Sequence, residues 1–159
     1  MTGRIETPRG EVILVDNNTR AELRWFPGMA NRWDARYDAA QKLLDSEVRK
    51  SLFKGEVPIY TKVRDEVPTL YGKTAEVGNV VVADGCRLNG TVENSVIFRE
   101  VKVEAGAEVK DSIVMQGCVI EKGASVQYTI LDKDVTVKSG TKLLGSAEHP
   151  LVIRKGVTV

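Results

Sequence analysis

Residues 92–142 read VENSVIFREVKVEAGAE, VKDSIVMQGCVIEKGAS and VQYTILDKDVTVKSGTK when they are written in three rows of 17 residues. The rows agree column by column, with aliphatic residues below aliphatic ones, hydroxyl residues below hydroxyl ones, and glycine below glycine. The matching columns are Val92, Val109 and Val126; Ser95, Ser112 and Thr129; Val96, Ile113 and Ile130; Val101, Cys118 and Val135; Val103, Ile120 and Val137; and Gly106, Gly123 and Gly140. A constant offset of this kind indicates an internal repeat, which decides the fold.

The spacing of aliphatic residues within each row indicates the shape of one repeat. They recur about every six positions, as from Val103 to Val109, which fits one short strand followed by one corner rather than a helix. Three such sides close a triangular coil, and Val and Ile stack well on their equivalents in the next coil. We therefore predict a mainly β protein, with a parallel β-helix of hexapeptide-type repeats over residues 75–159 and Val103, Ile120 and Val137 in one interior stack. The alternative, a β-sandwich of alternating strands, does not account for the constant offset.

Glycines mark the corners of the predicted coils. Gly106, Gly123 and Gly140 share a column, and Gly85 and Gly156 extend it outward at spacings of 21 and 16 residues. Glycine supplies the positive φ angle that a tight turn requires. We predict that all five are structural turn glycines.

The first third of the chain follows other patterns. Residues 11–15 (EVILV) and 20–26 (RAELRWF) predict a β-hairpin, and the apolar spacing over residues 34–53 predicts one amphipathic helix. A stacked β-helix has an open end that must be covered, and this helix is the natural candidate to cap it. The expected organisation is a hairpin and helix over 1–57, an extended lead-in over 58–74, and the β-helix over 75–159.

Composition excludes several functions. The 159 residues include 23 Lys and Arg against 22 Asp and Glu, so there is no basic field to attract nucleic acid. No apolar run is long enough to span a membrane and no charged-then-apolar leader opens the chain. We expect a cytoplasmic protein with no nucleic-acid or membrane partner.

Few residues in the sequence could carry chemistry. His149 is the only histidine and lies beside Pro150, outside the repeat register, so we expect a solvated loop residue rather than a general base. The Ser95, Ser112 and Thr129 column is typical of a structural ladder, because a nucleophile would be a single residue beside a base. Cys86 and Cys118 match no metal or redox spacing and are expected to be free, buried thiols. We predict no catalytic residue, no metal and no cofactor.

Several segments together resemble a known family. They are YDAAQKLLD (37–45), PIYTKVRDEV (58–67), VADGC (82–86), GTVENSVIF (90–98) and VKDSIVMQGCVIEKGA (109–124). Over residues 36–159 the chain resembles the carboxy-terminal region of glucose-1-phosphate adenylyltransferase (ADP-glucose pyrophosphorylase), most closely the D-type (GlgD) regulatory subunit of bacterial glycogen synthesis. The likeness implies a left-handed β-helix, a non-catalytic regulatory role, and assembly through the β-helix as a homo-oligomer or with a catalytic subunit.

The resemblance also implies where function lies and where it does not. Family enzymes bind phosphorylated effectors through Lys and Arg, which implies Lys62, Arg64 and Arg87 as effector-binding residues, although Asp65 and Glu66 beside Arg64 favour a local ion pair. Their amino-terminal nucleotide-binding domain opens with a glycine-rich phosphate loop that this sequence lacks. We therefore expect no nucleotidyl transfer and treat the chain as a carboxy-terminal piece or truncated relative.

Two alternatives remain open at this point. A hexapeptide-repeat acyltransferase would trimerise and bind acyl-CoA, whereas a structural or engineered fusion scaffold would carry a foreign leader. Residues 1–35 lie outside the resemblance. The segments LRWFPG (23–28) and AQKLLDSEV (40–48) are faintly similar to the amino-terminal part of phage minor capsid proteins.

Overall fold

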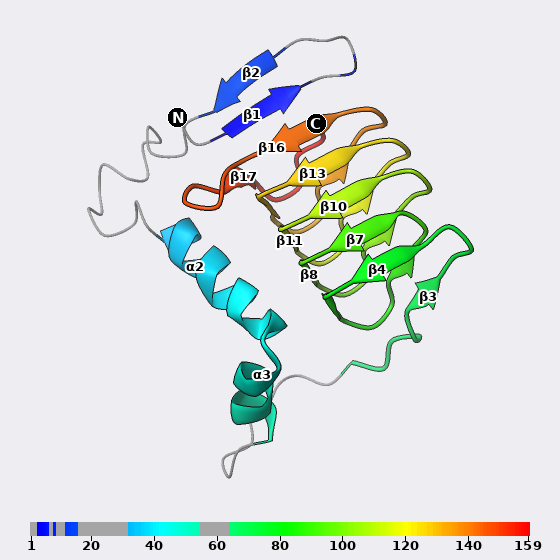
Figure 1. Ribbon diagram of the computed structural model, residues 1–159. Coiled ribbons are helices and arrows are strands. Elements are labelled where there is room, and N and C mark those ends of the chain that lie inside the picture. The colour runs from blue at the N-terminus through cyan, green and yellow to red at the C-terminus, as the bar shows by residue number, and fades with distance from the viewer. Residues whose placement is uncertain (1–2, 7, 9–11, 16–31, 55–63) are drawn as a thin grey trace.

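The computed structural model describes residues 3–6, 8, 12–15, 32–54 and 64–159. Its main body is a three-sided parallel β-helix, with two helices along one flank and a hairpin at one end (Figure 1). Side A contains β4 (Glu76–Gly78), β7 (Thr91–Glu93), β10 (Glu108–Lys110), β13 (Ser125–Gln127) and β16 (Lys142–Leu144). Side B contains β3 (Leu70–Tyr71), β6 (Arg87–Leu88), β9 (Lys102–Val103), β12 (Val119–Ile120) and β15 (Thr136–Val137). Side C contains β5 (Val81–Val82), β8 (Val96–Ile97), β11 (Ile113–Val114), β14 (Thr129–Leu131) and β17 (Leu151–Ile153).

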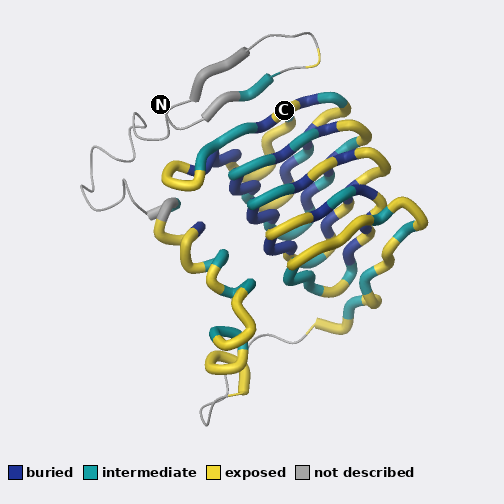
Figure 2. The backbone as a smooth tube through the Cα atoms, viewed as in Figure 1, coloured by how far each residue is buried: buried dark blue, intermediate teal, exposed yellow. Residues whose placement is uncertain are grey.

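The strand register confirms the repeat that the sequence predicts. Val103, Ile120 and Val137 pair in parallel on side B and are at most 1% exposed, so they form the expected interior stack. The β-helix begins slightly earlier than predicted, because β3 at Leu70–Tyr71 already pairs with β6. Figure 2 shows buried residues recurring at equivalent positions along successive coils.

The hydroxyl column forms a hydrogen-bonded ladder inside the wall. Ser112 N donates to Ser95 Oγ at 3.1 Å, and Thr129 N donates to Ser112 Oγ at 3.1 Å. Each hydroxyl also donates to the carbonyl oxygen two residues earlier. All three side chains are fully buried, and these bonds satisfy their polar groups. The column therefore has the structural role that repetition indicates.

The corner glycines divide between two columns, which corrects the prediction of a single one. Gly106, Gly123 and Gly140 each follow side B by three residues, whereas Gly85 and Gly156 each follow side C by three residues, next to Val82 and Ile153. The φ angles of all five are positive, between 71° and 77°. In the side C column the equivalent positions include Glu100 (φ 59°) and Asp134 (φ 57°), so this corner does not depend on glycine alone.

The predicted single helix is interrupted. Helix α2 (Arg32–Gln41) is followed by the 3₁₀ turn η3 (Lys42–Leu44) and then by α3 (Ser46–Phe53). Asp45 causes the break: its backbone is extended, and its carboxylate accepts a 2.8 Å hydrogen bond from Glu47 N, as an N-cap does.

The helix also does not cap the β-helix, contrary to expectation. Tyr37 of α2 packs on the outer face of side C against Ile113, Ile130 and Val152. The Tyr37 hydroxyl donates a 2.5 Å hydrogen bond to Asp111 O. Side C is apolar on both faces, so it binds a helix along its flank (Figure 1).

Both chain ends cover the carboxy-terminal end of the β-helix. Strand β1 (Gly3–Glu6) pairs with β16 in an antiparallel arrangement and with β2 (Val12–Val15) on its other side. On side B, Val159 N donates to Thr136 O at 2.9 Å. The predicted hairpin partner of 11–15, residues 20–26, lies outside the described residues; within the described part of the chain β2 pairs with β1.

Candidate functional site

The amino-terminal end of the β-helix, formed by the first coil, is where interior positions become accessible. Tyr71 and Val77 head columns whose next members, Leu88 and Val92, are fully buried. At this end Tyr71 is 53% exposed and Val77 is 40% exposed, and Leu70 beside them is 63% exposed. Tyr71 and Val77 therefore expose apolar side chains at the open end, whereas Leu70 lies on the outer face of side B, in the column of Arg87 and Lys102. Exposed apolar side chains of this kind are typical of a protein contact.

The same end carries three strand edges. β3, β4 and β5 are each the last strand of their side in the described part of the chain. Each is hydrogen-bonded to the second coil, as Leu70 N to Cys86 O at 2.9 Å and Gly72 N to Leu88 O at 2.8 Å. Unpaired strand edges next to apolar side chains favour association with another surface. We refer to these strands and their exposed side chains as the amino-terminal end.

Two of the three predicted effector-binding residues are described; Arg87 borders this end, and Arg64 precedes β3 by six positions in the chain. Arg87 lies directly opposite Leu70 in the parallel register and is exposed. Arg64 is exposed in the lead-in, and among the described residues it makes no ion pair with Asp65 or Glu66. Lys62 lies outside the described residues. The positions of Arg64 and Arg87 are compatible with an anion contact at the amino-terminal end, which stays a prediction.

His149 lies in an insertion between sides A and C. Thr129 pairs with Leu151, 22 positions further along the chain, so this coil is five residues longer than the 17-residue coils before it. The insertion is closed by Ser146 N donating to His149 O and His149 N donating to Ser146 Oγ, each at 3.1 Å. The residue is exposed, so the site lacks the walls that a general base needs around its substrate.

The two cysteines are free and buried, as predicted. Their thiols point at carbonyl oxygens, with Cys86 Sγ 3.0 Å from Phe98 O and Cys118 Sγ 3.0 Å from Asp132 O. Burial raises the pKa of Cys86 and raises that of Cys118 to about 12. Because the thiolate is the nucleophile, neither thiol is suited to chemistry.

We expect Ellman's reagent to leave both thiols of the folded chain unmodified at pH 8 and to modify both once guanidinium unfolds it. The folded chain retains thiol protons that the unfolded chain releases above about pH 8.5, so stability should fall as the pH rises from there toward 12. Spectrophotometric thiol counts and urea titrations at several pH values would measure both effects. Rapid labelling of Cys118 in native buffer would contradict the burial.

Other kinds of site find no support in the described residues. No group of three or more His, Cys, Asp or Glu side chains there could hold a metal ion. No helix in that part of the chain is long and apolar enough to cross a bilayer. A shallow hollow on α3 is lined by Ser46, Arg49, Lys50, Phe53 and Lys54, but Lys50 pairs with Glu47 at 2.6 Å.

Residues 62–149 match the family described as GlmU-like, C-terminal hexapeptide. The chain belongs to this family. It is also 52% identical over 121 residues to the glycogen biosynthesis protein GlgD of Bacillus subtilis (strain 168), a match that covers 76% of this chain and 35% of the relative. The GlgD protein of Geobacillus stearothermophilus is 54% identical over 118 residues, covering 74% of this chain and 34% of the relative.

A relative named for adenylyl transfer is less similar in sequence to this chain than the two GlgD proteins are. The glucose-1-phosphate adenylyltransferase of Geobacillus stearothermophilus is 37% identical over 78 residues, covering 49% of this chain and 19% of the relative. The chain thus spans about a third of the length of the GlgD relatives it matches. The likeness to GlgD is confirmed, over 121 residues or 76% of the chain, whereas nothing in these comparisons supports the phage-like resemblance of residues 23–28 and 40–48.

Sequence reasoning missed two features around the β-helix. One is the packing of Tyr37 on Ile113, Ile130 and Val152. The apolar residues on the outer face of side C could have indicated that a helix covers this side. The other is β1, whose four residues GRIE are too short and mixed to stand out. Both features depend on contacts between distant parts of the chain.

Proposed function

We propose that this chain is a non-catalytic assembly and regulatory module of a glucose-1-phosphate adenylyltransferase-like complex in bacterial glycogen biosynthesis. In this proposal the amino-terminal end of the β-helix binds the catalytic adenylyltransferase subunit or a second copy of the chain. The module works in the cytoplasm, uses no cofactor and transfers no nucleotide. The observation that carries the proposal is the 52% identity to GlgD over 121 residues.

The order of the relatives supports a regulatory role. The chain shares 52% and 54% identity with two proteins named for glycogen biosynthesis, and 37% with one named for adenylyl transfer. Because the match covers only about a third of each GlgD protein, the activity and partners of the whole protein enter here as proposals. The acyltransferase alternative would need a general base, and exposed His149 is a poor candidate.

The amino-terminal end supplies the contact surface in this proposal. Tyr71 and Val77 expose apolar side chains at positions that are buried in the next coil, and Leu70 exposes another on the outer face of side B. Burying these side chains against a partner would stabilise a complex. Arg87, which lies opposite Leu70, would bind a phosphorylated effector together with Arg64 and Lys62, which precede β3 in the sequence. Arginine suits this role because its guanidinium makes paired hydrogen bonds to phosphate.

The test is a binding measurement between this chain and the catalytic adenylyltransferase of the same organism. We expect Leu70→Asp to weaken binding more than about tenfold, because it places a carboxylate among the exposed apolar side chains of this end. Val157→Asp is the matched control, since Val157 is 39% exposed near the carboxy-terminal end, and it should change the affinity less than about twofold. Biolayer interferometry would give both dissociation constants.

Three results would contradict the proposal. Equal losses for Leu70→Asp and Val157→Asp, or no binding of the unchanged chain to the enzyme or to itself, would remove the amino-terminal end as a contact surface. Release of pyrophosphate from ATP and glucose 1-phosphate by the repurified chain alone would remove the non-catalytic role.

A further inference from the structure

The outer edge of β16 pairs with an antiparallel strand, β1, whereas the repeat strands of side A pair with one another in parallel. The five repeat strands of side A, from β4 to β16, run parallel, and each comes from a different coil. β1 adds to them in the antiparallel direction, with Arg4, Ile5 and Glu6 opposite Leu144, Leu143 and Lys142. It comes from residues 3–6, outside the family match of 62–149. The β-helix therefore ends in a sheet edge that a separate segment occupies.

Side-chain contacts define what this edge accepts. Ile5 packs against the hydrophobic core at the end of the column that Leu143 closes, and Leu143 itself is 1% exposed. Glu6 forms an ion pair with Lys142, with an oxygen–nitrogen distance of 3.5 Å. An extended segment bound here thus needs an aliphatic residue over Leu143, followed by an acidic residue opposite Lys142.

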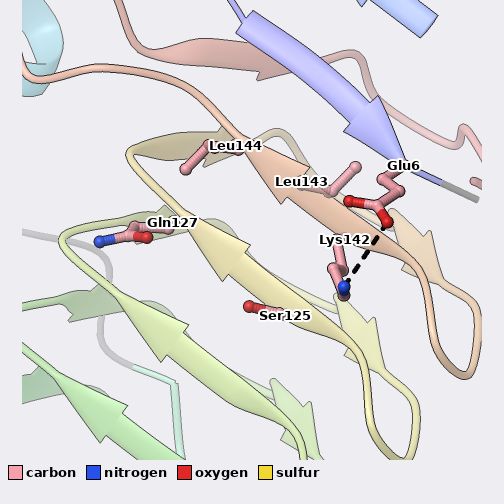
Figure 3. A pocket seen from close by; sticks show the side chains of 6 residues that line it. All are labelled: Glu6, Ser125, Gln127, Lys142, Leu143 and Leu144. Atoms are coloured by element: carbon pink, nitrogen blue, oxygen red, sulfur yellow. Dashed lines mark ion pairs between the residues drawn. The ribbon is translucent and has the colours of Figure 1, made fainter. Parts of the chain in front are cut away.

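A surface hollow lies beside the contact between β1 and the β-helix. A pocket of about 150 Å³ lies at this junction, lined by Glu6, Ser125, Gln127, Lys142, Leu143 and Leu144 (Figure 3). The lining combines polar groups of β13 and β16 with the side chain of Glu6 from β1 (Figure 3). The side chains of Lys142 and Glu6 are 60% and 31% exposed, so this pocket is a hollow on the outer face of side A beside the contact of β1 with β16.

We propose that the outer edge of β16 is a binding site for an extended peptide with an aliphatic residue followed by an acidic one. Gly3–Glu6 occupy the site within the same chain, and the same segment of a second copy can replace them. Strand addition of this kind derives affinity from main-chain hydrogen bonds and specificity from alternate side chains. The tethered strand prevails in an isolated chain because its effective concentration is high.

A labelled peptide of residues 1–8, MTGRIETP, tests the site on the full-length chain. Ile5→Lys places an ammonium group where Ile5 packs on the core, so the chain's own strand should leave the edge. We expect the peptide to bind this variant at least about tenfold more tightly than the unchanged chain, since the competing strand is removed. Fluorescence anisotropy would give both dissociation constants, and far-UV circular dichroism would check that the β-helix stays folded.

Charge reversal provides the matched control. The peptide with Glu6→Lys should bind the Ile5→Lys chain at least about fivefold more weakly, and adding Lys142→Glu to the chain should restore its binding. Equal binding of the peptide to both chains, or no effect of either charge change, would overturn the proposal.

Cross-linking tests the exchange between copies. A Glu6→Cys chain is mixed with a Lys142→Cys chain under oxidising conditions, because directly opposed residues lie within disulfide range and both native thiols are buried. We expect a mixed disulfide dimer on non-reducing gels, at least about fivefold more abundant than when Lys110→Cys replaces Lys142→Cys. Lys110 lies on the same side in β10 but is not opposite β1. Equal yields from the two pairings would exclude replacement of β1 by a second copy.

Discussion

Replacing Ile120 with alanine should lower the free energy of unfolding by about 2–5 kcal/mol. Ile120 is fully buried and stacks between Val103 and Val137 of the neighbouring coils. Its larger side chain fills the centre of the triangular cross-section, and alanine would leave a cavity that rigid, hydrogen-bonded walls on three sides cannot close. Urea unfolding followed by far-UV circular dichroism would measure the loss.

The neighbouring residue provides the control for this prediction. Val119 lies on the same strand but points outward and is only half-buried, so Val119→Ala should cost less than about 1 kcal/mol. Repeat proteins can unfold in stages, and hydrogen exchange at β9, β12 and β15 would show whether the loss is local to these coils. A cost below about 1 kcal/mol for Ile120→Ala would contradict its place in the stack.

The sequence predicted the register of the β-helix because stacking makes residues 17 positions apart physically equivalent. Val92, Val109 and Val126 pair on side A as the columns indicate. The same extrapolation failed for Gly85 and Gly156 because coil length is not constant. One step on side A is 15 residues, from Glu76 to Thr91, and the last step on side C is 22. Spacing alone therefore cannot assign a glycine to a corner once a coil has a shortened corner or an insertion.

The position of α2 was predictable from the strands of side C rather than from the spacing within the helix itself. Amphipathic spacing predicts that a helix will bury one face, but not which surface receives it. Side C strands such as Ile113–Val114 place one residue inside the coil and the other outside, and both are buried. A run that is apolar on both faces indicates a covered sheet, so side C, rather than the open end, was the surface to expect.

The candidate site was predictable only in outline. An open end of a stacked coil follows from the fold, and the pairing of Arg87 with Leu70 places one expected cation there. The exposure of Tyr71 and Val77 could not be deduced, because it depends on where the first coil begins. The β1 strand at the opposite end was equally hidden, since a four-residue edge strand is specified by its partner rather than by its own periodicity.

Replacing Tyr37 with alanine should release α2 from side C while the β-helix stays folded. Tyr37 is 5% exposed, contacts the outer column of side C, and donates its hydroxyl to Asp111 O. Burial, followed by the charge of Asp111, raises the pKa of Tyr37, so the phenol keeps the proton that this bond needs. Truncating a large buried aromatic side chain typically costs about 3–5 kcal/mol of stability. Isolated helices as short as the ten residues of α2 are barely stable in water, so α2 cannot offset this loss.

The released helix should be visible without global unfolding. Amide protons of Arg32–Gln41 should exchange at least about a hundredfold faster in Tyr37→Ala, whereas those of β12 and β15 should change little. Tyr37→Phe is the matched control: it keeps the ring and loses only the hydrogen bond to Asp111, worth about 1 kcal/mol, so exchange should rise less than about tenfold. Equal acceleration in both variants would mean that the hydroxyl, and not apolar packing, holds the helix. Loss of protection throughout the β-helix would mean that side C needs α2 in order to fold, because its outer column of Ile113, Ile130 and Val152 cannot remain exposed.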